Sequence, residues 1–326
     1  MAHAVDLKAV EEAAHRIRSL AFETPVIRNS YVDELVGKQV LFKCEIFQKG
    51  GAFKFRGACN AVLSLPQEQA ESGVITHSSG NHAGALALAA KARTIPCTVI
   101  TPQGTPRCKL DAIRGYNARV IECEPTMDAR EATCAAEQQR SGATFVPPYN
   151  AVPIIAGQGT IALEFLRQEP LDAIVVPVSG GGMISGIAVA AKAIQPDIQI
   201  YAAEPVGNNN AADVKAAKER GQLVPMARPN TIADGLQGRL GDLTWPIVRD
   251  LVEGVITISD MDILAAMRIC FERMKVVVEP SGATGLAAVM SPAFRCLRHK
   301  RVGVILCGGN VDLDVLWPLI KAKIPV

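Results

Sequence analysis

The chain has 326 residues, which at roughly 150 residues per domain predicts about two domains with a sizeable core. Hydrophobic residues make up 49% and charged residues 20%, which excludes a disordered chain. The 34 basic and 32 acidic side chains give a net charge of +2 and form no long basic run. We therefore expect a small-molecule ligand, with neither nucleic acid nor a membrane surface as partner.

The N-terminus and the cysteines indicate the compartment. Asp6, Glu11 and Glu12 stand where a signal peptide needs an apolar run, and no stretch reaches 18 apolar residues. The nine cysteines are scattered without a C-x-x-C pair, so neither a disulfide framework nor a zinc knuckle is indicated. We expect a cytosolic protein without a membrane span, in which most cysteines are buried.

Apolar runs of four to seven residues alternate with longer amphipathic or Ala-rich segments, which predicts an α/β protein with parallel strands. The expected strands are 40–44, 73–76, 97–100, 119–122, 173–178, 198–203 and 302–306. The expected helices are 7–22, 82–93, 106–115, 128–140, 159–167, 183–193, 261–274 and 283–290. Gly57, Gly80, Gly159 and the run 179–182 are interpreted as breakers between elements.

No Pro/Gly/Ser-rich linker marks a domain boundary, so the domains are expected to be interleaved. The Pro-rich turn 146–150 is the best candidate crossover, because proline continues neither helix nor strand. We predict a small α/β domain over 66–149, inserted into a large domain formed by 1–65 and 150–326.

Lys54 stands between Phe53 and Phe55, with glycines on both sides at 50, 51 and 57. Apolar surroundings lower the pKa of a lysine, and a neutral lysine can attack an aldehyde to form a Schiff base. The alternative is a surface lysine whose stem packs on the phenylalanines.

A glycine run, Ser179-Gly180-Gly181-Gly182-Met183, follows the expected strand 173–178 and precedes a helix. Glycines let the backbone approach an anion, and the N–H groups of a helix N-terminus attract it, so the run predicts a phosphate site. A dinucleotide site with Glu204 as the ribose ligand is the alternative. Ser185 replaces the third glycine of that fingerprint, and no Walker A motif occurs.

Two further strand ends carry polar groups. The segment 76–82 offers hydroxyls, an amide and a helix N-terminus, which suit a carboxylate. Cys307 follows the last expected strand, where open α/β sheets bind ligands, although a strand followed by a turn explains it equally.

Together, the lysine, the phosphate site and the carboxylate site resemble fold-type II pyridoxal-phosphate enzymes of the serine racemase and serine/threonine dehydratase family. The resemblance covers essentially the whole chain. It rests on residues 24–26, 42–45, 52–57, 78–82, 156–160, 231–235, 279–280 and 308–312. It implies a tryptophan synthase β-like fold with two open, twisted α/β domains and pyridoxal 5'-phosphate in the cleft between them.

The resemblance also implies roles for residues. Lys54 would be the Schiff-base lysine, and Ser79 the second acid/base. The implied cofactor contacts are Phe53, Lys54, Asn81, Ser179, Gly180, Gly181, Gly182, Met183, Gly235, Glu279 and Cys307. The implied substrate contacts are Ser78, Ser79, Gly80, Asn81 and His82.

The implied activity is serine racemisation with dehydration of serine to pyruvate and ammonia. Cys307 would face the pyridine nitrogen, and a neutral thiol makes the ring a weaker electron sink, which favours elimination. Dehydration of threonine or 3-hydroxyaspartate is the alternative within the class. A nicotinamide-dependent dehydrogenase and a non-catalytic amino-acid sensor are the alternatives from other classes.

The family's regulatory features are altered. Glu204 matches an acid that binds a divalent cation in the family, with Asn208 at a carbonyl position and Asn210 in place of a second carboxylate. A single anionic ligand predicts weak binding of Mg²⁺ or Ca²⁺.

A homodimer is expected, and the altered nucleotide-responsive surface argues against activation by ATP. That surface retains Lys49, Tyr116 and Asn310 and is substituted at Asn29, Gly50 and Gly84.

Overall fold

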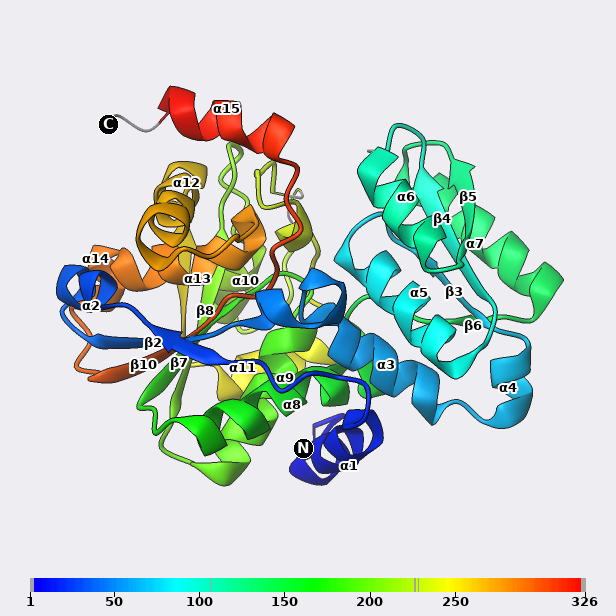
Figure 1. The fold of residues 1–326 in the computed structure, drawn as a ribbon. Coiled ribbons are helices and arrows are strands. Elements are labelled where there is room, and N and C mark those ends of the chain that lie inside the picture. Colours follow the sequence, from blue (N-terminus) through cyan, green and yellow to red (C-terminus); the bar gives the residue numbers. More distant parts are fainter. Residues whose placement is uncertain (1–2, 106, 226, 228, 324–326) are drawn as a thin grey trace.

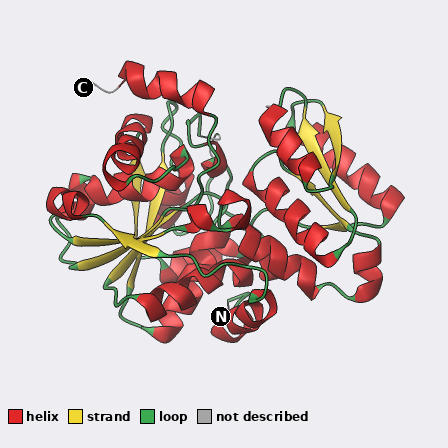
Figure 2. Ribbon diagram, in the orientation of Figure 1, coloured by secondary structure: helices red, strands yellow, loops and turns green. Residues whose placement is uncertain are grey.

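The structure is a computed structural model that describes residues 3–105, 107–225, 227 and 229–323. In this part of the chain the strands form one six-stranded and one four-stranded sheet. Figures 1 and 2 show the two sheets apart from each other, each flanked by helices. The predicted α/β class is therefore confirmed.

The six-stranded sheet joins the two ends of the chain. β10 lies between β2 and β7, and all neighbours are parallel except β1, which is antiparallel to β2. In spatial order the strands are β1 (Val26–Arg28), β2 (Gln39–Lys43), β10 (Arg301–Ile305), β7 (Ala173–Pro177), β8 (Gln199–Pro205) and β9 (Gly254–Ile258).

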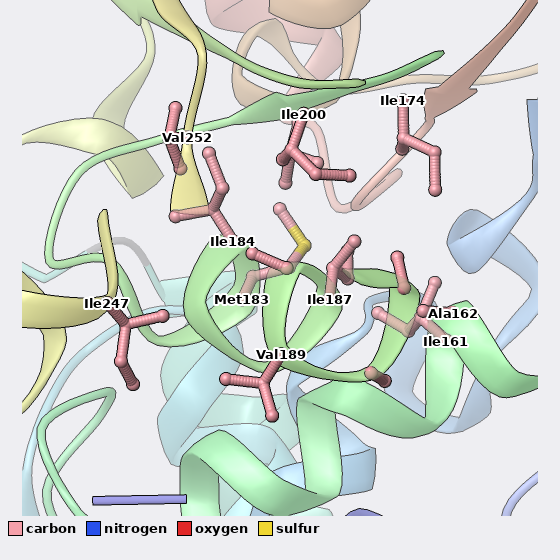
Figure 3. Packing of buried hydrophobic residues seen from close by; sticks show 14 of the residues in the cluster. Ile161, Ala162, Ile174, Met183, Ile184, Ile187, Val189, Ile200, Ile247 and Val252 are labelled. Atoms are coloured by element: carbon pink, nitrogen blue, oxygen red, sulfur yellow. The ribbon is translucent and has the colours of Figure 1, made fainter. Parts of the chain in front are cut away.

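Both faces of this sheet are covered, as its apolar strands require. On β7, Ile174 and Val176 belong to one core cluster and Val175 to the other. The first cluster, part of which appears in Figure 3, includes α1 (Leu7–Ile17), α8 (Val152–Gln168), α9 (Gly182–Ile194), α10 (Asp213–Arg220) and α11 (Thr244–Leu251). The second includes α2 (Ser30–Val36), α12 (Asp260–Ile269), α13 (Pro280–Met290), α14 (Pro292–Arg295) and α15 (Leu313–Lys323).

The four-stranded sheet is wholly parallel. Its order is β5 (Arg119–Cys123), β4 (Cys97–Pro102), β3 (Val74–His77) and β6 (Thr144–Phe145). Its helices are α4 (Gln67–Glu71), α5 (Asn81–Arg93), α6 (Arg107–Gly115) and α7 (Met127–Ser141). Helix α3 (Lys54–Ser64) contacts α5 and also α8 of the larger sheet. The domain limits at 66 and 149 remain a prediction.

Two glycines interpreted as breakers lie inside helices, and this prediction is wrong. Gly57 is in α3 and Gly159 in α8. A Cβ on Gly57 would come within 2.4 Å of Gln158 Nε2, and one on Gly159 within 2.8 Å of the Gly186 carbonyl oxygen. The missing side chains allow α3, α8 and α9 to cross closely, so glycine serves packing here.

The remaining short elements are three 3₁₀ turns and one π turn, namely Glu45–Phe47, Lys49–Gly51, Asp234–Leu236 and Cys270–Met274. The eight cysteines whose side chains the structure describes are unpaired, and all of these except Cys296 are buried. Among the described helices, none combines the length and apolar character needed to cross a bilayer.

Candidate active site

A cavity of about 790 Å³ lies at the carboxyl ends of strands from both sheets, with His77 of β3 and Pro177 of β7 in its wall. Every residue that the sequence predicts to contact cofactor or substrate lines it. These residues are Phe53, Lys54, Ser78, Ser79, Gly80, Asn81, His82, Ser179, Gly180, Gly181, Gly182, Met183, Gly235, Glu279 and Cys307. Their individual roles remain predictions.

Lys54 is the first residue of α3, and its Nζ donates a hydrogen bond to the Pro148 carbonyl oxygen at 2.6 Å. The same Nζ lies 5.1 Å from the centre of the Phe53 ring. Burial lowers the pKa of Lys54 to about 8, against the opposing influence of the Glu279 carboxylate. A lysine with this pKa has a neutral fraction near pH 7, so it can act as a nucleophile toward an aldehyde.

The glycine run connects β7 to α9, which begins at Gly182. A Cβ on Gly180 would lie 2.4 Å from the Tyr149 ring, and Gly181 has a φ of +86°. The N-cap residue of α9, Gly181, has no side chain to bond the first N–H groups of the helix, which leaves them available to a ligand. The glycine run therefore exposes backbone N–H groups with no side chains in front of them, and such a surface fits a phosphate group.

A second helix N-terminus faces the same cavity. Asn81 begins α5, whose N-cap Gly80 has no side chain to occupy the N–H groups. Asn81 Nδ2 donates to Glu279 Oε1 at 2.7 Å, and Asn81 Oδ1 accepts from Asn310 Nδ2 at 2.9 Å. This arrangement fits a carboxylate at the helix terminus, with Asn81 held in place by its neighbours.

His82 is a neutral residue of this helix. Burial and the nearby Lys54 lower its pKa to about 3. Its Nε2 lies 3.0 Å from the Val146 carbonyl oxygen, which can only accept, so Nε2 carries the ring proton. His82 therefore brings no positive charge to a substrate carboxylate.

Cys307 lies two residues after β10 and is 2% exposed. Burial and the neighbouring Glu279 raise the pKa of its thiol well above the usual value. Its backbone oxygen accepts a hydrogen bond from the Phe53 N–H at 3.0 Å, which fixes the start of α3. Cys307 thus presents a neutral thiol to the cavity.

Part of the cavity wall was not predicted from the sequence. His77, which lies in the predicted segment 76–82, stacks on Phe145 with ring centres 5.2 Å apart. The unpredicted Arg130 and Glu131 come from the first two turns of α7. Burial lowers the pKa of His77. For Phe145, Arg130 and Glu131, a place in the sequence at or after the carboxyl ends of β6 and β5 is the only signal that could have found them.

Glu204 lies outside the cavity. Its carboxylate accepts the N–H groups of Val214 at 2.7 Å and Lys215 at 2.9 Å, and so caps α10. Burial raises the pKa of Glu204 to about 7, and Asp213 adds to the rise. Asn208 and Asn210 are exposed nearby, and the described residues contain no group of three metal-ligating acids, histidines or cysteines. These residues do not fit a tight cation site.

Comparisons with known proteins agree with this geometry. Residues 17–308 match the family described as pyridoxal-phosphate dependent enzyme. A serine racemase of Arabidopsis thaliana is 52% identical over 326 residues, which cover 98% of each sequence. A beta-hydroxyaspartate dehydratase of Paracoccus denitrificans is 45% identical, over 93% of this chain and 96% of the relative. The maize serine racemase structure matches with a TM-score of 0.94 and 47% identity over 98% of each chain, which confirms the fold-type II architecture. The chain therefore belongs to the family of pyridoxal-phosphate dependent enzymes.

Proposed function

We propose that the chain racemises serine and also dehydrates L-serine to pyruvate and ammonia. The observation that carries the proposal is a lysine of lowered pKa in one cavity with two helix N-termini, suited to a phosphate and to a carboxylate. The similarity to a serine racemase and to a beta-hydroxyaspartate dehydratase supports both reactions.

Pyridoxal phosphate, when bound, supplies an aldehyde for a lysine and a conjugated ring that stabilises negative charge at the substrate Cα. Ser179 to Met183 would hold its phosphate, and Lys54 Nζ would hold its aldehyde. Asn81 and the neutral Cys307 would contact the ring. The N–H groups at the start of α5 would orient the substrate carboxylate.

The residues of the cavity also move protons. Lys54 Nζ, partly neutral near pH 7, removes the proton from the substrate Cα. Ser79 Oγ returns a proton to Cα from the opposite face, which gives the other enantiomer. Loss of the β-hydroxyl as water, followed by hydrolysis, gives pyruvate and ammonia instead.

A panel of L- and D-amino acids, assayed for keto acid and for enantiomer, tests this proposal. Formation of both D-serine and pyruvate from L-serine is expected. Threonine or 3-hydroxyaspartate as the better substrate would favour the alternative dehydratase function. The alternative of a nicotinamide-dependent dehydrogenase required Glu204 to bind a ribose. Glu204 instead caps α10 outside the cavity, which argues against that alternative. A homodimer and the lack of ATP activation remain predictions.

The lowered pKa of Lys54 predicts how cofactor capture depends on pH. Only the neutral amine attacks the aldehyde, so capture by the cofactor-free chain should accelerate as pH rises and level off above about 8. Growth of the visible absorbance band, followed by stopped flow between pH 6 and 10, measures this rate. Nα-acetyl-lysine is the control, and its rate should still be rising at pH 10 because its ordinary pKa is about 10.4. A rate for the protein that also still rises at pH 10 would contradict the desolvated state of Lys54.

Cys307→Asp is expected to shift the reaction away from elimination. A carboxylate beside the pyridine nitrogen favours its protonated form, and a charge-assisted hydrogen bond contributes about 1.5–3 kcal/mol. The ratio of dehydration to racemisation should therefore fall at least about tenfold. Product assays on L-serine measure the ratio, and Cys307→Asn controls for side-chain size. An unchanged ratio of dehydration to racemisation in folded Cys307→Asp would show that residue 307 does not influence the protonation of the pyridine ring.

Divalent cations should bind weakly through Glu204, with amide oxygens of Asn208 and Asn210 adding no charge. Asn210→Asp restores a carboxylate and should tighten Ca²⁺ binding about tenfold or more. Thermal melts across a Ca²⁺ titration, with Mg²⁺ and EDTA alongside, measure the affinity. If Glu204→Gln responds to the ions as the parent does, or Asn210→Asp shows no gain, the cation binds elsewhere.

A further inference from the structure

Four charged side chains form a buried cluster outside the cavity lining. Lys43, Glu45 and Arg56 have fully buried side chains, and the side chain of Glu164 is 17% exposed. We call these residues the buried charge quartet. With two cations and two carboxylates, it carries no formal net charge.

Arg56 is the centre of the quartet, and an acceptor is present for each of its five N–H groups. Its Nε and Nη2 donate to the two oxygens of Glu45 at 2.7 and 2.8 Å. Its Nη1 and Nη2 donate to the two oxygens of Glu164 at 2.7 and 2.8 Å, and Nη1 also donates to Thr160 Oγ1 at 3.2 Å. Each carboxylate thus accepts two hydrogen bonds from the guanidinium, and we call each of these bidentate pairs a fork. The two forks fix both the position and the tilt of the guanidinium plane.

Lys43 completes the network from the sheet. Its Nζ donates to the Thr24 carbonyl oxygen at 2.7 Å, to Glu164 Oε2 at 2.8 Å and to Gln168 Oε1 at 2.9 Å. Thr24 in turn donates its hydroxyl to Glu45 Oε1 at 2.6 Å. The hydrogen bonds therefore link the loop before β1, strand β2, the turn at Glu45, helix α3 and helix α8.

Stability alone is a weak reason for such a cluster. Burying each ion costs several kcal/mol, and well-packed apolar side chains of similar volume often stabilise a protein as well or better. Directional hydrogen bonds differ from apolar packing in one respect, because they hold their partners in a single arrangement. The element held most tightly by the quartet is α3, through Arg56.

Arg56 and Lys54 belong to the same first turn of α3. Residues two apart in a helix are rotated by about 200° around its axis, so their side chains point to nearly opposite sides. Arg56 thus holds one side of the turn, while Lys54 presents Nζ to the cavity from the other side. The backbone at this point is also held by the Phe53 N–H, which donates to the Cys307 carbonyl oxygen at 3.0 Å, and by the Gly57 N–H, which donates to Gln158 Oε1 at 3.1 Å.

We propose that Arg56 is a positioning residue for Lys54. The two forks fix the rotation of α3 about its axis, and this rotation places Lys54 Nζ in its desolvated position beside Pro148. The proposal rests on the proposed function, in which Lys54 is the reactive lysine.

Arg56→Lys tests the proposal, because it keeps the positive charge and loses both forks. Competitive labelling of the full-length, cofactor-free chain with acetic anhydride, read by mass spectrometry across pH, reports the pKa of Lys54 without any turnover. We expect a midpoint near 8 in the parent. In Arg56→Lys, water reaches Nζ and the midpoint should rise by about one unit or more, which means about tenfold less neutral amine at pH 7.

Lys43→Met is the matched control. Lys43 is equally buried and belongs to the same quartet, but it lies on β2 and not on the helix of Lys54. We expect Lys43→Met to lower the melting temperature while the Lys54 midpoint stays near that of the parent. Glu164→Gln is the milder second variant if Arg56→Lys does not fold, and it should raise the midpoint by a smaller amount.

Two results would overturn the proposal. The first is a lowered melting temperature in Arg56→Lys with an unchanged Lys54 midpoint, which would make the quartet purely structural. The second is an equal midpoint shift in Lys43→Met. A wrong assignment of the proposed function would give a different result. Lys54→Ala would then keep the visible band of the cofactor, while the labelling results for Arg56→Lys and Lys43→Met would be as expected.

Discussion

Lys54→Ala is expected to abolish the visible absorbance band of the bound cofactor and to lower turnover of L-serine by at least about 10⁴-fold. The variant loses both the amine that holds the aldehyde and the base that removes the Cα proton. The fold should persist, because Lys54 Nζ lies at the cavity wall, where it bonds the Pro148 carbonyl oxygen. Absorbance spectra, turnover assays and thermal melts measure the three effects.

The control for this variant is Lys91→Ala, an exposed lysine on α5 that should leave the band and the turnover unchanged. Borohydride reduction of the parent, followed by peptide mapping, should place the cofactor on Lys54. Methylamine added to Lys54→Ala should restore part of the band, since the glycine run still offers its N–H groups to the phosphate. A band that survives in Lys54→Ala would exclude Lys54 as the attachment site.

The parallel strands could be predicted from the sequence because each is a continuous apolar run between helical segments. The runs predicted at 97–100, 119–122 and 173–178 match β4, β5 and β7 within two residues. β1, β6 and β9 were missed. β1 and β6 span three and two residues, and β9 is an edge strand that is only half-buried along most of its length.

Helix α3 was missed for a different reason. It carries Lys54 at its start and Gly57 one turn later, and a glycine inside a short segment is more typical of a turn. Gly57 is required by Gln158 on α8, which lies far away in sequence. Local propensity cannot report a contact of this kind, because tertiary packing decides it.

The cavity could be predicted because parallel strands bring their carboxyl ends to one edge of a sheet, where glycine turns and helix N-termini collect. Ser179 to Met183 and Ser78 to His82 follow this rule. Arg130 and Glu131 do not belong to such a motif, and only the approach of α7 places them in the wall. Glu204 also ends a strand, yet its carboxylate turns to the N-terminus of α10, ten residues further along the chain.

Ser79→Ala is expected to separate the two reactions. Racemisation of L-serine needs a proton donor on the face of Cα opposite Lys54, whereas dehydration of L-serine needs only the base on the Lys54 face. A positioned acid contributes about 10²–10⁴-fold, so racemisation should fall by that factor while dehydration of L-serine falls much less. Dehydration of D-serine should fall with racemisation, because its Cα proton points toward Ser79.

Ser78→Ala is the matched control, because Ser78 lines the same cavity one residue earlier. Its hydroxyl oxygen accepts a hydrogen bond from the Gly80 N–H at 3.4 Å. Loss of Ser78 is expected to weaken substrate binding in both reactions alike, because it affects the loop that orients the carboxylate. Initial rates for D-serine and pyruvate from L-serine, measured in the same reaction, give the ratio directly. Equal losses of both products in Ser79→Ala would assign Ser79 to carboxylate binding, because a residue that only binds the substrate cannot distinguish the two faces of Cα.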